Sequence, residues 1–424
     1  MTQSRIANPA FIEQVDIISN KPPRNTVSIL GGIISFVYYE SMLSDSLRAT
    51  ITFADTGAAK NDATNNTSVV EGLPIVGQEK VQIKFKDNNE NKIGDKPELI
   101  LYVNSVKVID NDTTRSLVQL DLVSREFILN EKTRITKRYD GKLSETVKKL
   151  LEDKNSIGLE TEKDLFIEDT SNNFNFIGNN KKPFYVINWL ARKSVSSTNQ
   201  KLGKSAGYFF YERSDGYYFK SVDSLFSQEK KKSFIYTETT GVPKGYDANV
   251  LSFKKGNLID AQKKLQIGAY STRTILFDPF TTYYEVITPN AENNEDDLKL
   301  GGNNLPVLNP EFNQPGANKE FSRTTYYLLD KGTLASGDNE QQLEKKNEEN
   351  FEYSQILNQS IMRLNQFFSS QATITIAGDF SLHIGDAIYL DLPKLGIDRG
   401  KELDKQDSGL YIIAELTHLV DTNG

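Results

Sequence analysis

Histidine and cysteine, which most often ligate metals or activate nucleophiles, are almost missing from this sequence. Its 424 residues include no cysteine and only two histidines, His383 and His418. A zinc centre needs cysteine or histidine ligands at short spacing, and neither histidine has a second one close by in the sequence. Each lies in or beside a strand pattern, so we interpret both as structural residues at the surface or an interface of a β-barrel. The sequence therefore predicts no metal site and no cofactor.

Carboxylates are plentiful enough to supply the acid pair of a glycosidase. Glu126, Asp386 and Asp391 are the candidates that lie beside strand patterns. Nothing in the residues around them marks such a pair, so we predict no catalytic residue. The acidic run Glu295–Asp297 lacks the spacing and the glycine of a calcium-binding loop.

Phosphate chemistry and nucleic-acid binding leave no signature either. The sequence contains no P-loop, no G-x-G-x-x-G and no G-x-S-x-G. The pairs Gly31-Gly32 and Gly301-Gly302 are typical of turns. Lys230–Lys232 is interpreted as a solvated turn, because a phosphate site needs more basic partners. The formal net charge of −7 argues against a general binder of nucleic acid or anionic membranes.

Composition indicates a globular protein with more than one core. Hydrophobic residues make up 38% and charged residues 25% of the chain, and its length corresponds to roughly three domains. The first twenty residues have no apolar core and no cleavage pattern, so we do not expect a signal peptide. No apolar run approaches the ~20 residues of a membrane span. We therefore expect no membrane insertion.

The stretch 182–226 is the element around which the rest must be arranged. Apolar residues at helical spacing predict a helix over 184–194, and the aromatic runs 208–211 and 217–219 predict a hairpin around Asp215-Gly216. Both faces of this ribbon carry aromatic rings, so both must be covered. We expect the helix on one face and a second domain or subunit on the other.

The remaining patterns predict a mainly β, α+β protein of four parts. Strands over 1–128 predict a small barrel or sandwich, and 129–245 reads as a mixed α/β domain that contains the 182–226 unit. The strand patterns over 246–288 and 371–424 repeat a feature of the first part: an apolar segment, a glycine turn and then alternating apolar and polar residues. This repetition predicts a second barrel similar to the first, built from two separate stretches of the chain. The insertion 289–370 combines a long polar loop, a candidate partner contact, with a helix that packs on its own domain or between subunits.

Several segments in a fixed order resemble one protein family. They are KPFYVINWLARKS followed by AGYFFYERSDGYYFKSVDSL within 181–225, VEGLPIVGQEKVQIKFKD at 70–87, DGKLSETVKKLLED at 140–153, and ATITIAGDFSLHIGDAIYLDLP with GLYIIAELTHLV within 372–420. The chain thereby resembles the baseplate central hub (tail hub) subunit of T-even-like contractile-tailed phages, the myoviruses. The type VI secretion VgrG and the late control protein D belong to the same superfamily.

The resemblance implies two similar, tail-tube-like β-barrels joined by the mixed α/β domain. It implies a homotrimer whose six barrels form a pseudo-sixfold ring, which adapts a threefold spike to a sixfold tail tube. The implied partners are the spike or tail lysozyme protein, tail tube initiator proteins and baseplate wedge proteins. Tape measure protein and then DNA would pass through the channel without specific binding. The implied location is the virion tail baseplate, assembled in the host cytoplasm.

Two other classes of function remain alternatives. One is a cell-wall-degrading hub enzyme. The other is a receptor- or carbohydrate-binding tail module, suggested by 19 tyrosines and 23 phenylalanines. Most of these rings fall at alternating or helical spacing, which is typical of core positions rather than of an exposed binding face. We therefore favour a structural virion protein that is not an enzyme.

Overall fold

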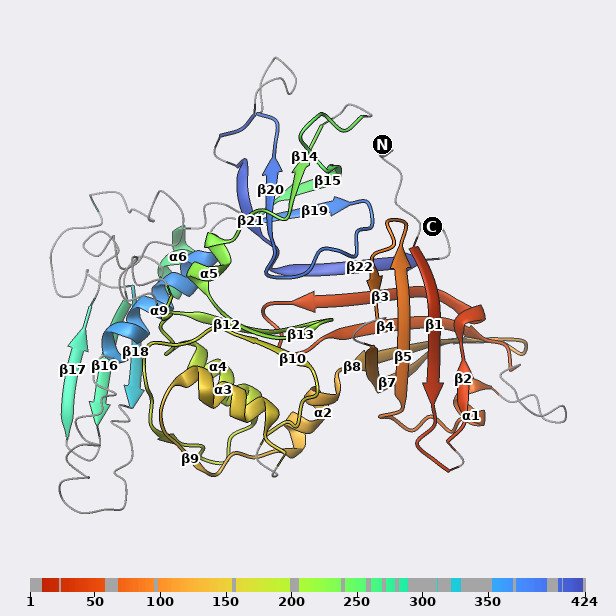
Figure 1. Cartoon of the computed structure of the whole chain (residues 1–424), viewed down its shortest axis with the longest axis horizontal. Coiled ribbons are helices and arrows are strands. Elements are labelled where there is room, and N and C mark those ends of the chain that lie inside the picture. The colour runs from red at the N-terminus through yellow and green to blue at the C-terminus, as the bar shows by residue number, and fades with distance from the viewer. Residues whose placement is uncertain are drawn as a thin grey trace.

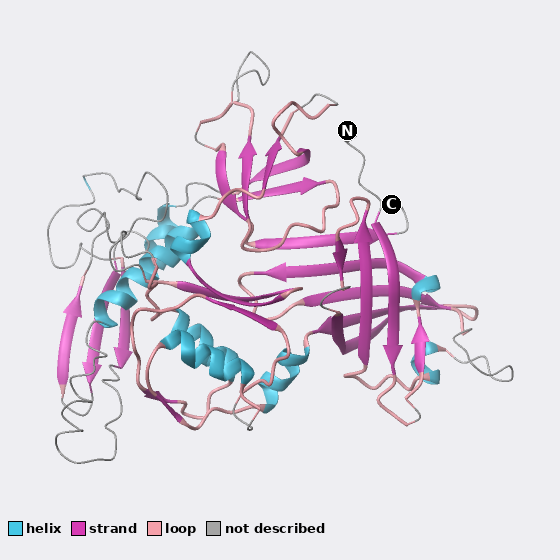
Figure 2. Cartoon of the chain, in the orientation of Figure 1, coloured by secondary structure: helices cyan, strands magenta, loops and turns pink. Residues whose placement is uncertain are grey.

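The computed structural model describes most of the chain. The described residues are 10–22, 24–57, 68–94, 98–154, 158–198, 206–237, 241–256, 261–268, 272–278, 282–288, 311, 322–328, 353–368, 371–394, 403–405 and 407–421. The acidic run Glu295–Asp297, Gly301-Gly302 and the first half of the helix expected in the insertion lie outside them. Strands predominate in the described part, as Figure 2 shows, and the expected mainly β fold with barrel-like sheets is confirmed.

The largest sheet is antiparallel and strongly curled (Figure 1). Its order is β2-β1-β5-β7-β8-β4-β3-β22, with β6 paired to β5. The strands are β1 (Ala10–Ile18), β2 (Thr26–Ser28), β3 (Ile33–Ser41), β4 (Arg48–Asp55), β5 (Lys80–Asp87), β6 (Lys92–Ile93), β7 (Leu99–Asn111), β8 (Ser116–Val123) and β22 (Glu415–Asp421). The short helices η1 (Leu30–Gly32) and α1 (Val69–Gly72) belong to the same part.

Strict alternation gives this sheet its core. Val81, Ile83 and Phe85 of β5 are fully buried, while the residues between them are half-exposed. The Phe85 ring packs edge-on against Phe36 at a centroid separation of 5.0 Å. Because successive side chains of a regular strand point to opposite faces, the buried apolar residues of these strands lie on the inside of the curl.

The position of β22 differs from the sequence-based expectation. Its residues were predicted in the second barrel, but β22 pairs with β3, from Glu415 opposite Ser41 to Asp421 opposite Ser35. Alternation identifies a strand without identifying its neighbour, and here the neighbour lies near the other end of the chain. The described strands also leave the sheet open, with β2 and β22 at its two edges.

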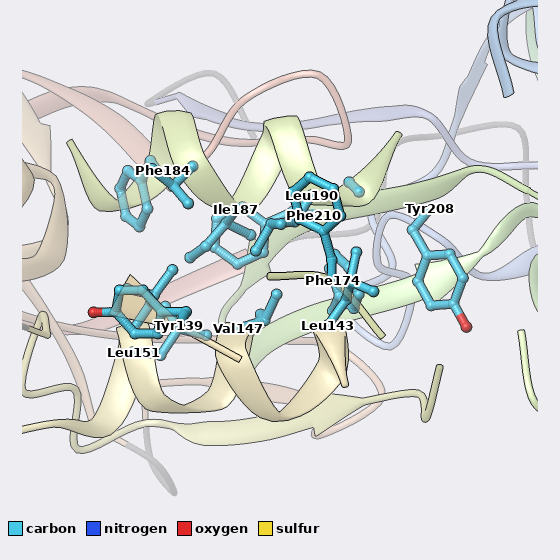
Figure 3. Packing of buried hydrophobic residues seen from close by; sticks show 14 of the residues in the cluster. Tyr139, Leu143, Val147, Leu151, Phe174, Phe184, Ile187, Leu190, Tyr208 and Phe210 are labelled. Carbon is cyan, nitrogen blue, oxygen red and sulfur yellow. The ribbon is translucent and has the colours of Figure 1, made fainter. Parts of the chain in front are cut away.

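The middle of the chain forms the mixed α/β part. Its elements are α2 (Arg125–Lys132), β9 (Arg138–Tyr139), α3 (Leu143–Glu152), β10 (Asp164–Ile167), β11 (Phe176–Ile177), α4 (Pro183–Ala191), β12 (Tyr208–Arg213), β13 (Gly216–Ser221) and α5 (Val222–Ser227). Figure 3 shows α3 and α4 packing their apolar faces together, with Phe210 of β12 between them and Tyr208 at one end.

The aromatic ribbon β12–β13 is covered on both faces, as expected. Phe184 of α4 packs against Phe210 at 5.5 Å on one face. On the other face, Phe209 packs against Phe367 at 4.7 Å, and a small core there also contains Ile384 from the last third of the chain. The second cover thus comes from distant segments of the same chain.

The hairpin turn lies one residue earlier than the sequence suggests. Arg213 pairs with Gly216, so the two-residue loop is Ser214-Asp215. Gly216 is already in the strand, where a Cβ atom would lie 2.2 Å from the carbonyl oxygen of Asp164 on β10. The glycine is therefore required by the close approach of a third strand rather than by the turn.

Two smaller sheets complete the fold. The second sheet has the order β19-β15-β14-β20-β21, and β14 comes from the range predicted as part of the mixed domain. Its strands are β14 (Lys232–Ile235), β15 (Ala248–Lys255), β19 (Ala372–Ile376), β20 (Ala387–Asp391) and β21 (Gly409–Ile412). The third sheet has the order β17-β16-β18. Its strands β16 and β17 were predicted in the second barrel but belong to this separate sheet. It comprises β16 (Thr272–Asp278), β17 (Tyr283–Ile287) and β18 (Arg323–Leu328), accompanied by α6 (Ala261–Ile267) and α9 (Tyr353–Phe367).

Helix α9 packs on its own chain, one of the two arrangements left open by the sequence. Arg363, 1% exposed, donates from Nη1 to the carbonyl oxygen of Ala206 at 2.9 Å and forms an ion pair with Asp223 through Nη2. Thr274 of β16 bonds to Asn358 on the same helix. The helix therefore joins the third sheet to the aromatic ribbon.

The substitution Arg363→Ala is expected to lower the free energy of unfolding by about 3–5 kcal/mol, because it leaves the carboxylate of Asp223 buried without its cation. Urea unfolding measures the change. The double variant Arg363→Met with Asp223→Leu removes both charges and should lose markedly less. If both variants lost the same free energy of unfolding, the loss would come from packing and not from the unpaired charge of Asp223.

Candidate functional site

The segment His383–Asp386 brings two sequence-predicted residues to a junction of three parts of the fold. It immediately precedes β20 of the second sheet. The carboxylate that receives it is Glu40, near the end of β3 in the first sheet. The hairpin loop at Ser214 reaches the same carboxylate from the mixed α/β part. We call these residues, Glu40, Ser214 and His383–Asp386, the polar junction.

Glu40 is 0% exposed and its carboxylate has hydrogen-bond partners on several sides. Oε1 accepts from the Tyr38 hydroxyl at 2.7 Å and from the Ser214 N–H at 3.3 Å. Oε2 accepts from the Ile384 N–H at 3.1 Å, and Nδ1 of His383 lies 3.1 Å from Oε1. A buried carboxylate is tolerated only when its lone pairs are filled in this way.

These contacts set the protonation state of Glu40. Burial by itself would raise the pKa of its carboxyl group. Hydrogen bonding to His383 and the charge of that ring, with hydrogen bonds from Tyr38 and from the Ile384 N–H, outweigh burial and lower the pKa of Glu40 below its ordinary value. The same carboxylate, added to burial, raises the pKa of Tyr38 well above 10.0. Glu40 is thus an anion held in place, not a proton donor.

Asp386, within the polar junction, is bound to two cations. Arg213 donates from Nη1 at 3.2 Å and Lys231 from Nζ at 2.7 Å. Lys232, the next residue, forms an ion pair with Asp379. Lys232 belongs to β14, so the prediction of a solvated turn is wrong for it, whereas Lys231 is exposed at a bend. Both lysines attach the start of β14 to the loop before β20.

Glu126, a second carboxylate considered from the sequence, belongs to a separate network. Lys163 lies between Glu126, at 3.2 Å, and Glu212 of the hairpin. Burial alone would raise the pKa of Glu126, but the charge of Lys163 outweighs it and lowers that pKa. Glu212 is 1% exposed, and burial together with repulsion from Glu126 raises its pKa in spite of Lys163. Glu212 also accepts the Leu47 N–H at 2.9 Å, which ties the hairpin to the loop between β3 and β4.

Asp391, the third candidate, lies on β20 and accepts a hydrogen bond from the Tyr246 hydroxyl. That bond, with a smaller effect of burial, raises the pKa of Tyr246 to about 12. The three carboxylates therefore lie in three different networks, each with its own structural partners. Among the residues that the structure describes, no group of three or more histidine or acidic side chains could hold a metal ion.

His418 lies inside the first sheet rather than at its surface. It is 7% exposed on β22, stacked 6.1 Å from Tyr38 and edge-on to Phe380 at 4.8 Å. Burial lowers the pKa of its imidazole to about 4, because the charged form loses its water. His383 instead lies at the interface between parts, which agrees with the interpretation of the histidines as structural.

A pocket that no sequence pattern revealed opens between the mixed α/β part and the third sheet. Its volume is about 500 Å³. Aromatic and aliphatic side chains line it, and Lys181 and Lys193 are its charged residues; the aromatic set is Phe174, Phe176, Tyr185, Trp189, Tyr326 and Tyr327. The Nζ atom of Lys193 lies over the Trp189 ring at 4.6 Å, and that of Lys181 over Tyr185 at 5.3 Å. The two walls are far apart in sequence, so local patterns could not join them.

Comparison with solved structures shows which fold the chain has. The 43 kDa tail protein of prophage MuSo2 from Shewanella oneidensis matches 97% of this chain and 95% of its own, with a TM-score of 0.51 and 9% identity. The tail protein from Neisseria meningitidis MC58 matches 98% and 93%, with a TM-score of 0.51 and 8% identity. No protein-family model and no curated protein matched the sequence. The chain therefore shares its fold with these tail proteins.

None of the helices in the described part of the chain is long and apolar enough to cross a membrane.

The substitution Glu40→Gln is expected to lower the free energy of unfolding by about 3 kcal/mol, because hydrogen bonds to a charged acceptor are lost and an amide N–H₂ faces backbone donors. Glu415→Gln is the matched control. Glu415 is exposed on β22 and accepts from the Tyr39 hydroxyl at 3.2 Å. Its replacement should change stability by no more than about 0.5 kcal/mol in the same urea titrations. If Glu40→Gln left the free energy of unfolding unchanged, the polar junction would not be a stabilising contact.

His418 should make stability depend on pH in a defined window. Its pKa of about 4 lies below the unfolded value near 6.5, so its contribution is complete above pH 6.5 and declines as the pH falls towards 4. Between pH 6.5 and 5 the loss amounts to about 1.6 kcal/mol. The variant His418→Phe keeps a ring against Tyr38 and removes the titration. Its stability should be nearly flat over that window, and a slope equal to that of the wild type would assign the pH effect to another group.

Proposed function

We propose that this chain is a structural virion protein, the central hub subunit of a phage tail baseplate. The observation that carries the proposal is the match of almost the whole chain to two phage tail proteins over almost their whole lengths. A fold shared end to end, rather than through one common domain, favours a shared architectural role. The fold alone does not define a role, so the assembly must be tested directly.

The assembled form in this proposal is a homotrimeric ring. The proposed division of each subunit starts from 1–128 for the first barrel, 129–245 for the mixed domain, 246–288 with 371–424 for the second barrel, and 289–370 for the insertion. Strand pairing changes it at three points, because β22 joins the first sheet, β14 joins the second, and β16 and β17 belong to the third. Three subunits with two curled β-domains each would present six similar walls, so a threefold object could meet a sixfold one. The curled first sheet and the smaller second sheet support this arrangement.

The proposed partners follow from that position. A spike or tail lysozyme protein would bind on one side of the ring, tail tube initiator proteins on the other, and baseplate wedge proteins around it. Tape measure protein and DNA would pass through the centre. The net charge of −7 suits passage of DNA, since bound phosphates require cationic groups. The proposed location is the virion tail, after assembly in the host cytoplasm.

A role without catalysis is part of the same proposal. Every carboxylate that the sequence made a candidate is held by structural partners, and two of them by lysine or arginine. The alternatives, a cell-wall-degrading hub enzyme and a carbohydrate- or receptor-binding module, predict peptidoglycan lysis on a zymogram and binding on a glycan array. The purified full chain should give neither signal.

Light scattering of the purified chain should give about three times the subunit mass of 47.8 kDa, and negative-stain images should show a ring with a central hole. If the isolated chain is smaller, addition of its spike protein should produce the trimer, because the spike supplies the threefold template. A strict monomer at high concentration that also fails to assemble with the spike would refute the hub proposal.

A further inference from the structure

The aromatic pocket and its rim form an apolar surface without a cover among the described residues. Tyr326 and Leu328 of β18 are 74% and 76% exposed, and Tyr185 of α4 is 56% exposed. The sheet order β17-β16-β18 leaves β18 at the edge of its sheet, on the side of the pocket. Exposed aromatic residues beside an open strand edge and a preformed pocket are typical of a protein-binding surface. We call this surface the basic pocket.

Its charge restricts what can bind there. Lys181 and Lys193 line the pocket, and none of the described residues that line it is acidic. Burial raises the pKa of the Tyr327 hydroxyl in the pocket wall, while the nearby charges of Arg192 and Arg323 lower it. Two lysines thus line an apolar cavity on a chain whose net charge is −7. The complementary ligand is an apolar segment that carries carboxylates.

The chain itself presents such a segment. At the end of β7, Val108 and Ile109 are 55% and 53% exposed. The register between β7 and β8 shifts between Val108 and Asp110, so Ile109 lies at a bulge, where the regular alternation of side chains is interrupted. Two large apolar side chains are therefore exposed next to each other there. Two carboxylates follow at once, Asp110 and Asp112. Lys107 is paired with Asp121 at 3.0 Å, which leaves the tip with these two acids and one cation, Arg115. We call residues 107–115 the hairpin tip.

The hairpin tip also has an open backbone edge. Among the strands that the structure describes, β5 pairs with β7 only along 99–102, whereas β8 pairs with β7 along most of its length. The outer half of β7 therefore has N–H and C=O groups on one side that no described strand pairs. Uncovered apolar edges of this kind are a hazard for aggregation unless a partner occupies them.

The two surfaces lie at opposite ends of the long axis of the molecule. The third sheet is at the left of Figure 1, and the large sheet that bears the hairpin tip is at the right. One surface cannot reach the other within a single chain. Complementary surfaces at opposite ends join copies head to tail, and such contacts close into a ring when the rotation between copies permits it.

We propose that the hairpin tip of one subunit docks in the basic pocket of the next. Val108 and Ile109 enter the apolar cavity, Asp110 and Asp112 face Lys181, and the side of β7 that no described strand pairs runs beside β18. This inference rests on the proposed ring of identical subunits and names the surfaces that hold it together.

Cysteine cross-linking tests the contact cleanly, because the chain contains no cysteine of its own. In the full chain, the pair Ile109→Cys and Leu328→Cys should form disulfides between subunits under mild oxidation. A non-reducing gel should show dimer and closed trimer, and each single variant should give no trimer. The control pair is Val76→Cys with Leu328→Cys, since Val76 is 70% exposed but lies outside the hairpin tip. It should give no trimer.

A charge exchange provides a second readout that does not depend on disulfides. Lys181→Glu should weaken association between subunits at least about ten-fold, and Asp110→Lys in the same chain should recover most of it. Light scattering over a concentration series measures both. A variant Ile109→Asp should weaken association by a similar factor or more, because it places a charge in the apolar cavity.

The outcomes separate this inference from the hub proposal. Suppose that the wild type is trimeric, that the double-cysteine variant forms no cross-link between positions 109 and 328, and that Lys181→Glu does not weaken association. These results together would overturn the docking contact and leave the ring proposal intact. Binding of a glycan in the pocket that leaves the oligomer unchanged would overturn it as well. A chain that stays monomeric with its spike protein present, and forms no cross-link, would refute both.

Discussion

A carboxylate taken out of water must find hydrogen-bond donors on every side, and Glu40 finds them on three parts of the chain. Its partners are Tyr38 on the same strand, the Ser214 N–H of the hairpin loop, and His383 with the Ile384 N–H before β20. None of these groups could move away alone without leaving the anion unsatisfied. The first sheet, the aromatic ribbon and the second sheet are therefore held in one relative orientation.

The other boundaries of the fold are closed by the same device. Asp87 of the first sheet accepts the Phe380 N–H at 3.0 Å, Glu212 of the ribbon accepts the Leu47 N–H, and Asp223 holds Arg363 of α9. Each of these carboxylates is at most 5% exposed. Apolar surfaces alone would tolerate several packings, whereas a buried acid has few acceptable positions. Buried carboxylates at these joints are therefore expected to favour one arrangement of the parts over alternative packings.

Local physics made part of this structure predictable. The two-sided aromatic ribbon, its helical cover and the alternation of β5 follow from spacing, and those elements are present. Strand partnership does not follow from spacing. Pairing of β22 with β3 and of β16 with β18 depends on contacts far apart in sequence, and alternation carries no information about them. For the same reason the sequence did not predict the role of Glu40. By its pattern it is an ordinary residue of a half-buried strand, and only its contacts with the distant 383–386 segment show its role.

The openness of the first sheet then has a physical consequence. The described strands of this curled sheet end at β2 and β22, and no described strand pairs with the outer half of β7 on one side. These edges keep backbone donors and acceptors that a closed barrel would satisfy internally. The end of β7 carries charged residues and shifts register between Val108 and Asp110, both of which protect an edge against unspecific pairing, yet the large apolar side chains of Val108 and Ile109 stay exposed there. Uncovered apolar surfaces at both ends of one chain suit the proposed ring of identical subunits, because each subunit could cover a surface of its neighbour.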